Sequence, residues 1–228
     1  IKLGISRCLV GDKVRYDGRH KRSSVCCHEL SSLFQLIPIC PEVESGLPVP
    51  RPPVELVQQE ERVRAIGRDD PSMDVTSQLI DFCEQKKVLL SSLSGFILTP
   101  RSPSCGLGST PIKLQSDLSI TEIGNGLFAN HLLENFPHLP LIEETELSDY
   151  RTIKHFQLRV ILYKRCQDDN LVGMSELLDK IITTEFHTDF QLETLENKMR
   201  VLNNILNKLS TDKLDNLLNQ IEEGHHES

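Results

Sequence analysis

A short apolar run near the start of the chain leads directly into a cysteine: Lys2-Leu3-Gly4-Ile5-Ser6-Arg7-Cys8. Three further runs of the same kind lie at residues 36–39, 95–98 and 139–142. Their length and apolar character predict buried strands. Helical patterns separate them, over about residues 24–35, from Asp74 or Thr76 onward, and over about 126–136. This alternation predicts βαβ units, and therefore an α/β fold built as a parallel-sheet, Rossmann-like sandwich.

Two features depart from this alternation. Apolar segments at residues 54–57 and 63–66 flank a polar stretch and predict a hairpin. After about residue 147 only helical patterns remain, over about 148–165, 174–187, 190–209 and 211–222. We therefore predict a sheet domain over residues 1–147 and a small α-helical C-terminal unit over residues 148–228.

Composition excludes several classes of protein. The 228 residues are 38% hydrophobic, as in a globular chain. No run approaches the roughly 18 apolar residues of a membrane helix, so we expect no membrane partner. The first residues also lack the apolar segment and cleavage site of an export signal, and we expect a cytoplasmic protein.

The net charge of −8 is unevenly distributed. Residues 1–110 hold 14 Lys and Arg against 13 Asp and Glu, whereas residues 111–228 hold 11 against 20. An acidic second half repels the phosphate backbone of a nucleic acid, so we do not expect binding that is driven by charge alone. The charge balance still allows the first half to bind a small anionic ligand. The oligomeric state stays open.

The chain contains seven cysteines, at positions 8, 26, 27, 40, 83, 105 and 166. An odd number in a chain that is expected to remain in the cytoplasm favours ligands, nucleophiles or core residues over disulfides. The helical patterns place Cys27 and Cys83 on apolar faces and turn Cys26 elsewhere. We therefore expect Cys27 and Cys83 to fill the core.

Three of the cysteines lie at predicted strand ends. Cys8 follows the first strand, Cys40 ends the second, and Cys105 lies in the loop after the third. Chemistry in an open parallel sheet gathers at the carboxyl ends of the strands, so the three thiols could converge. Three thiolates leave one corner of an iron–sulfur cube, or one position on zinc, open for a substrate. The alternative is three ordinary buried cysteines.

Polar residues near these cysteines are candidates for acid–base chemistry and for substrate binding. Glu42 lies two residues after Cys40, and a carboxylate beside a desolvated site can transfer protons. The alternative for Glu42 is a solvated loop residue. Ser102 and Ser104 either position water or substrate or hold the turn between them. A basic patch is centred on Arg15-Tyr16-Asp17-Gly18, and it either binds a phosphate or is a solvated loop.

Six motifs occur in order along the first part of the chain. They are Ser6-Arg7-Cys8-Leu9-Val10-Gly11, Val14-Arg15-Tyr16-Asp17-Gly18, Cys40-Pro41-Glu42, Gly46-Leu47-Pro48-Val49-Pro50-Arg51-Pro52-Pro53, Asp74-Val75-Thr76 and Ser102-Pro103-Ser104-Cys105-Gly106. Together they resemble the thiouracil desulfidase (TudS) family. The resemblance covers about residues 1–147.

This resemblance implies an iron–sulfur enzyme that removes sulfur from thiolated uracil compounds. A 4Fe-4S cluster would be held by Cys8, Cys40 and Cys105, with one iron left open for the sulfur of the substrate. Glu42 would be the acid–base group, with Ser102 assisting. The reaction would be a non-redox, hydrolytic cleavage of the carbon–sulfur bond that yields the oxo base and sulfide.

We expect the substrate to contact Arg15, Tyr16, Asp17 and Ser104. The preferred substrate is a small thiolated base or nucleotide, such as 2- or 4-thiouracil or a 4-thiouridine nucleotide. The acidic second half disfavours a large polyanion. A locally basic surface would still admit 4-thiouridine in tRNA, so tRNA is kept as a second candidate partner.

The rest of the chain resembles the long, two-domain members of the family, in which a helical domain follows and which are linked to 4-thiouridine in tRNA. The motifs are Gly126-Leu127-Phe128-Ala129, Phe136-Pro137-His138-Leu139-Pro140 and Ile142-Glu143-Glu144. The segment Glu185-Phe186-His187-Thr188 resembles the start of that helical domain. Only about 40 residues follow this segment, so we interpret residues 148–228 as a shortened form of the accessory domain.

Two alternatives from other functional classes stay open at this point. One is a hydrolase that depends on zinc or on a single nucleophilic cysteine, with His20 and His28 as nearby zinc ligands. The other is a non-catalytic module that holds a cluster and recruits a partner through the apolar stripe of residues 195–209.

Overall fold

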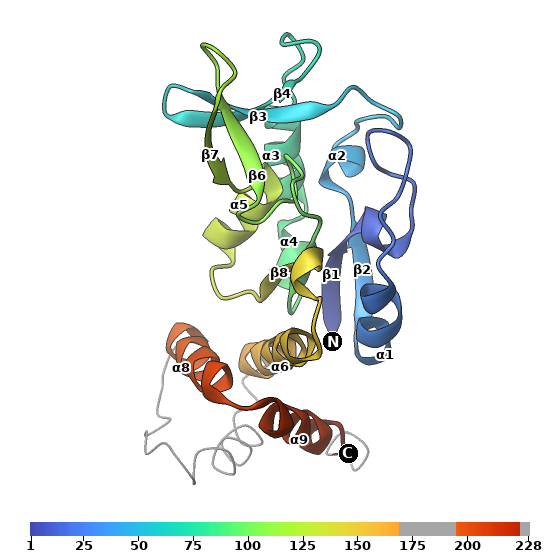
Figure 1. Ribbon diagram of the computed structural model, residues 1–228, viewed down its shortest axis with the longest axis vertical. Coiled ribbons are helices and arrows are strands. Elements are labelled where there is room, and N and C mark those ends of the chain that lie inside the picture. Colours follow the sequence, from blue (N-terminus) through green and yellow to red (C-terminus); the bar gives the residue numbers. More distant parts are fainter. Residues whose placement is uncertain (169–194, 224–228) are drawn as a thin grey trace. The chain divides into compact units, whose positions relative to one another are not determined.

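The computed structural model describes residues 1–168 and 195–223 (Figure 1). The chain divides into two compact units, Ile1–Glu146 and Leu147–Ser228. The helix predicted over residues 174–187 lies outside the described residues. None of the helices that the structure describes is long and apolar enough to cross a membrane.

A four-stranded parallel sheet forms the centre of the first unit, with strand order β2-β1-β5-β8 (Figure 1). Its strands are β1 (Lys2–Ser6), β2 (Gln35–Ile39), β5 (Phe96–Leu98) and β8 (Leu141–Glu143). All four strands were predicted, and their parallel pairing confirms the α/β fold. The central strands are apolar on both faces because side chains cover both sides of a parallel sheet.

Helices of the first unit are anchored to this sheet by aromatic packing. They include α3 (Thr76–Gln85), α4 (Lys87–Ser91) and α5 (Leu127–Asn135). The ring of Phe128 on α5 lies 5.2 Å from that of Phe96 on β5 and 6.2 Å from that of Phe82 on α3, between centroids. The buried Phe128 side chain therefore joins α3 and α5 to the central sheet.

A second, mixed sheet has the strand order β4-β3-β6-β7. The predicted hairpin is confirmed as β3 (Val54–Gln59) and β4 (Arg62–Gly67), which pair antiparallel. Sequence reasoning missed β6 (Thr110–Leu114) and β7 (Ile120–Gly124). Pro111 interrupts the pattern of β6, and β7 is exposed and mixes apolar with polar side chains, so neither strand has a continuous apolar run.

The cysteines of the first helix are placed differently from the prediction. Cys26 is fully buried, whereas Cys27 is only partly buried. The helix contains a π-helical turn, η2 (Cys26–Leu30), before α1 (Ser31–Leu33), and this turn shifts the side-chain phase relative to an α-helix. Cys83 is buried as predicted.

The second unit is helical in the residues that the structure describes. Its helices are α6 (Tyr150–Gln167), α8 (Leu195–Lys208) and α9 (Thr211–Glu223), and α6 packs against both of the others. Leu202, Ile205, Leu206 and Leu209 are buried. The apolar stripe that could recruit a partner is therefore used here, at least in these four residues, for packing within the unit.

Candidate active site

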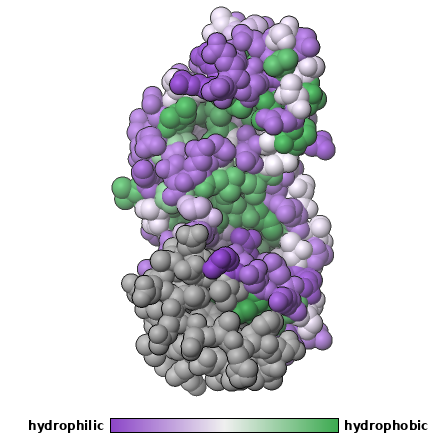
Figure 2. All heavy atoms as spheres, turned by 90° about the vertical axis from the view of Figure 1, so that its left-hand side faces the viewer, coloured by the Kyte–Doolittle hydropathy of each residue, from purple (hydrophilic) through white to green (hydrophobic). Residues whose placement is uncertain are grey.

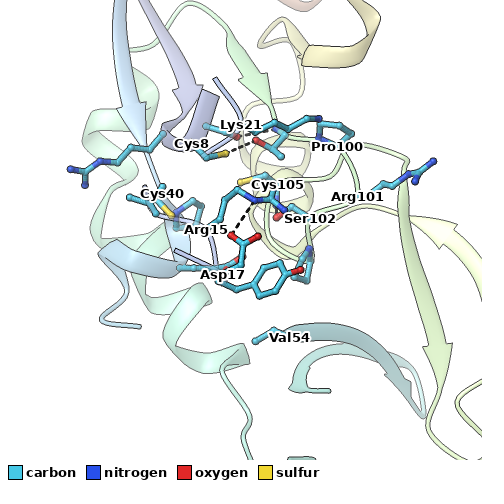
Figure 3. Close-up of a pocket in the computed structure, with 18 of the residues that line it drawn as sticks. Cys8, Arg15, Asp17, Lys21, Cys40, Val54, Pro100, Arg101, Ser102 and Cys105 are labelled. Carbon is cyan, nitrogen blue, oxygen red and sulfur yellow. Dashed lines mark hydrogen bonds and ion pairs between the residues drawn. The ribbon is translucent and has the colours of Figure 1, made fainter. Parts of the chain in front are cut away.

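A cavity of about 1000 Å³ lies at the carboxyl ends of β1, β2 and β5 (Figure 3). Its lining comes wholly from the first unit and includes Cys8, Cys40 and Cys105. Pro53, Val54 and Arg68 add a wall from the second sheet and its flanking loops. The site thus has the position that is typical of a parallel α/β sheet.

Each of the three cysteines reaches the cavity from a different segment. Cys8 lies in the short 3₁₀ helix η1 (Arg7–Val10), Cys40 directly precedes α2 (Pro41–Glu44), and Cys105 lies in the loop after β5. Figure 3 shows their sulfur atoms around the same space. The structure therefore brings together the three cysteines that were singled out from the sequence. The other four do not line the cavity.

Burial dominates the acid–base behaviour of these thiols. It raises the pKa of Cys8, raises the pKa of Cys40 to about 11, and raises the pKa of Cys105 well above its ordinary value. The neighbouring thiols add to the shift at Cys40 and Cys105 because adjacent negative charges repel one another. Three such groups favour the thiolate form only beside a positive charge, which bound metal supplies.

The donor set suits a group with several metal atoms. Three thiolates are soft ligands that iron in a sulfur-rich cluster accepts. Within residues 1–168 and 195–223, no three His, Cys, Asp or Glu side chains are placed as ligands of one metal ion. Ligands of a cluster bind different irons and do not have to approach one another as closely.

Glu42 lines the same cavity from α2. Its side chain is 13% exposed, and both of its oxygens are held. Arg51 donates from Nε to Glu42 Oε2 over 2.8 Å and from Nη2 to the same oxygen over 2.5 Å. Ser104 donates from Oγ to Glu42 Oε1 over 2.9 Å. The carboxylate is therefore fixed in position at the wall of the cavity.

Arg51 was part of a quoted motif, but sequence reasoning gave it no role. Its side chain is 3% exposed. Beyond Glu42, its Nη1 donates to the carbonyl oxygens of Val14 and Pro48, and its backbone N–H donates to Tyr16. Arg51 thus joins the acidic residue to the loop that carries the predicted substrate-binding residues. The sequence feature that could have pointed to a role for Arg51 is its place in the Pro-rich segment of residues 46–53.

The two serines differ in their relation to the cavity. Ser104 is 1% exposed and does not line the cavity, so its hydroxyl contacts Glu42 rather than a substrate. Ser102 does line the cavity. Its Oγ accepts the backbone N–H groups of Ser104 and Cys105, over 3.2 and 3.0 Å. Two accepted bonds leave the Ser102 hydroxyl proton available to the cavity.

The basic patch contributes side chains to the lining of the cavity. Arg15, Tyr16 and Asp17 all contribute, and Arg15 lies 3.7 Å from the carboxylate of Asp17 (Figure 3). His20 and Lys21 also belong to the lining, whereas His28 does not. In all, seven Lys and Arg side chains line the cavity against three Asp and Glu. Several of these cations form ion pairs, among them Arg15 with Asp17, Lys21 with Glu144 and Arg51 with Glu42. The remaining excess of positive charge in the lining suits an anion.

Comparison with known proteins identifies the family. The family model described as 2-thiouracil desulfurase matches residues 3–144, more than half of the chain. The chain belongs to this family. The matched residues include every residue that we have placed at the cavity.

One solved structure agrees with this assignment. It is described as the 4Fe-4S-dependent thiouracil desulfidase TudS, and it is similar to this chain with 30% sequence identity and a TM-score of 0.51. The match covers 64% of this chain and 92% of that chain. No curated protein matches the chain significantly. The predicted resemblance to the desulfidase family is therefore confirmed.

Proposed function

We propose that the protein is a 4Fe-4S-dependent desulfidase that converts the thione of a thiolated uracil to a carbonyl. Water is consumed and sulfide is released, so the reaction balances without an oxidant or reductant. The observation that carries the proposal is the meeting of Cys8, Cys40 and Cys105 at a cavity that Glu42 also lines. These cysteines would hold the cluster.

The cluster, when bound, would supply a soft Lewis acid for the sulfur of the substrate. Side chains of the protein would carry out the proton transfers. Glu42 would take a proton from the attacking water and return it to the departing sulfur. Arg51 and Ser104 hold the carboxylate for this task, and Ser102 would donate its free proton to the substrate. General acid–base catalysis of this kind contributes about 100- to 10,000-fold.

The charge of the cavity supports a nucleotide in preference to a free base. A uracil ring needs few cationic partners, whereas a phosphate is stabilised by several. Arg15, Arg19 and Lys21 lie on one loop at the lining of the cavity. We propose that they face the phosphate of a thiolated uridine nucleotide. Thiolated uridine in tRNA is a second candidate.

A substrate panel tests the proposal. Anaerobically reconstituted protein is mixed with 2-thiouracil, 4-thiouracil and 4-thiouridine monophosphate, and loss of thione absorbance is followed together with sulfide release. We expect turnover, with the highest kcat/KM for the nucleotide. In Arg15→Gln the KM for the nucleotide should rise about tenfold, the effect of one lost charge-assisted hydrogen bond, while the free base is unaffected. No turnover of any thione by protein that carries the cluster would overturn the proposal.

A further inference from the structure

Two buried hydroxyl groups contact the cysteines of the site. Ser6 is the last residue of β1, and Thr99 directly follows the adjacent parallel strand β5. They are 2% and 4% exposed. Thr99 Oγ1 lies 3.0 Å from Cys8 Sγ, and the Ser6 hydroxyl bonds to Cys105. Neither residue was singled out from the sequence.

The direction of both hydrogen bonds follows from the chemistry of a metal ligand. A cysteine that binds iron is a thiolate and has no proton to donate. The hydroxyls must then be the donors. The backbone N–H of Thr99 donates to Ser6 Oγ over 3.0 Å, which occupies an acceptor position of Ser6 and leaves its proton for Cys105.

The third cysteine receives its hydrogen bond in another way. Cys40 accepts from the backbone N–H of Val43, within the turn that it begins. Among the donors named here, those to Cys8 and Cys105 are side chains, whereas the donor to Cys40 is a backbone group. Substitution can remove the side-chain donors one at a time and leave every proposed ligand in place.

We infer that Ser6 and Thr99 are positioning residues that tune the cluster through its ligands, donating to Cys105 and Cys8 respectively. This inference rests on the proposed function. A hydrogen bond to a ligand sulfur withdraws electron density from it and weakens its donation to iron. Hydrogen bonds of this kind are among the factors that set the reduction potential of iron–sulfur clusters. They also leave the irons more electron-poor, which suits a Lewis acid.

Thr99→Val and Ser6→Ala test the inference in the reconstituted holoprotein. The readouts are the reduction potential of the cluster and its iron–thiolate stretching frequencies by resonance Raman spectroscopy. We expect each variant to keep its iron, to shift the potential to more negative values and to raise the stretching frequencies. The double variant should shift the potential further than either single variant. Thr99→Ser, which keeps the hydroxyl, should restore the wild-type values.

Ser23→Ala is the matched control. Ser23 is 5% exposed and bonds through its hydroxyl to Cys26, a buried cysteine that does not line the cavity. The control loses a buried serine–cysteine hydrogen bond of the same kind, away from the proposed ligands. We expect no change in the potential or in the iron–thiolate frequencies.

The outcomes separate this inference from the proposed function. Wild-type protein without iron and sulfide contradicts the proposed function. Wild-type protein with a cluster, and an unchanged potential in Thr99→Val, contradicts only the role of the hydroxyls. If Thr99→Val loses its cluster, Thr99→Ser decides: a retained cluster supports the hydrogen bond, and the same loss overturns it.

Discussion

Arg51 binds Glu42 through two nitrogens of one guanidinium, with both bonds to the same carboxylate oxygen. The other end of that guanidinium is held by the carbonyl oxygens of Val14 and Pro48. The buried guanidinium of Arg51 therefore positions Glu42, the proposed acid–base residue, and also holds the loop that carries Arg15, Tyr16 and Asp17.

This relationship makes Arg51→Lys a non-conservative change, because an ammonium cannot reproduce the fork. We expect kcat to fall about 100-fold, the usual cost of a misplaced catalytic group. Stability should fall by about 1.5–3 kcal/mol through the lost charge-assisted bonds. Steady-state kinetics and urea unfolding measure the two effects. The matched control is Arg62→Lys, which changes an exposed arginine of β4. Wild-type kcat in Arg51→Lys would show that Glu42 needs no such support.

Glu42→Gln tests the acid–base role itself. The amide can turn its oxygen to Arg51 and its nitrogen to Ser104, so the fold and the iron content should be retained. It cannot transfer a proton, and kcat should fall by about 100- to 10,000-fold. Iron analysis and kinetics on the same sample separate the two properties. Glu61→Gln, in the exposed turn between β3 and β4, should behave as wild type. Turnover of Glu42→Gln at the wild-type rate would remove the residue from the mechanism.

The two serines should give different defects. Ser104→Ala removes the bond to Glu42 Oε1 and should lower kcat without changing KM. Ser102→Ala removes the acceptor of two backbone N–H groups in the Cys105 loop, so it should also lower the retention of iron. Iron loss during dilution into a chelator measures this retention. A raised KM with unchanged kcat in Ser104→Ala would instead indicate direct contact with the substrate.

Two buried cysteines outside the cavity should lower the free energy of unfolding at alkaline pH. Burial raises the pKa of Cys26 to about 11 and that of Cys83 to about 12. Above about pH 9 the unfolded chain releases these protons and the folded chain does not, so the free energy of unfolding falls as the pH rises. Urea unfolding of the metal-free protein at pH 8, 9 and 10 should show this decline. Cys83→Ala should reduce its slope, and an equal slope would exclude Cys83 as a cause.

A variant that ends at Glu146 should keep iron and activity on small thiouracils. The whole cavity lies in the first unit, and the solved desulfidase is covered to 92% by the matching 64% of this chain. Iron analysis and the substrate panel provide the measurement. Loss of nucleotide turnover with the cluster retained would show that the second unit takes part in the reaction.

Much of the fold could be predicted from the sequence because the parallel strands are continuous apolar runs. Residues 3–5 and 95–98, for example, are buried on both faces of the sheet. The strands β6 and β7 could not be found in this way. Pro111 interrupts the apolar pattern of β6, and Ile120 and Ile123 of β7 are more than half exposed.

Site residues that follow strand ends could be predicted from the sequence. Residues that only hydrogen-bond to other site residues could not. The positions of Cys8, Cys40, Cys105 and Glu42 were expected from the topology. Thr99 was not, because a hydroxyl that contacts sulfur across two strands leaves no pattern in the sequence. The roles of the serines depend on side-chain direction in a single turn, which spacing does not define.

The most direct test of the central claim is the amount of iron, acid-labile sulfide and zinc per chain in anaerobically purified protein. The account predicts about four iron and four sulfide. Both should fall sharply in Cys8→Ala, Cys40→Ala and Cys105→Ala, and both should persist in Cys26→Ala. About one zinc per chain without sulfide would contradict the account and would favour a zinc-dependent hydrolase.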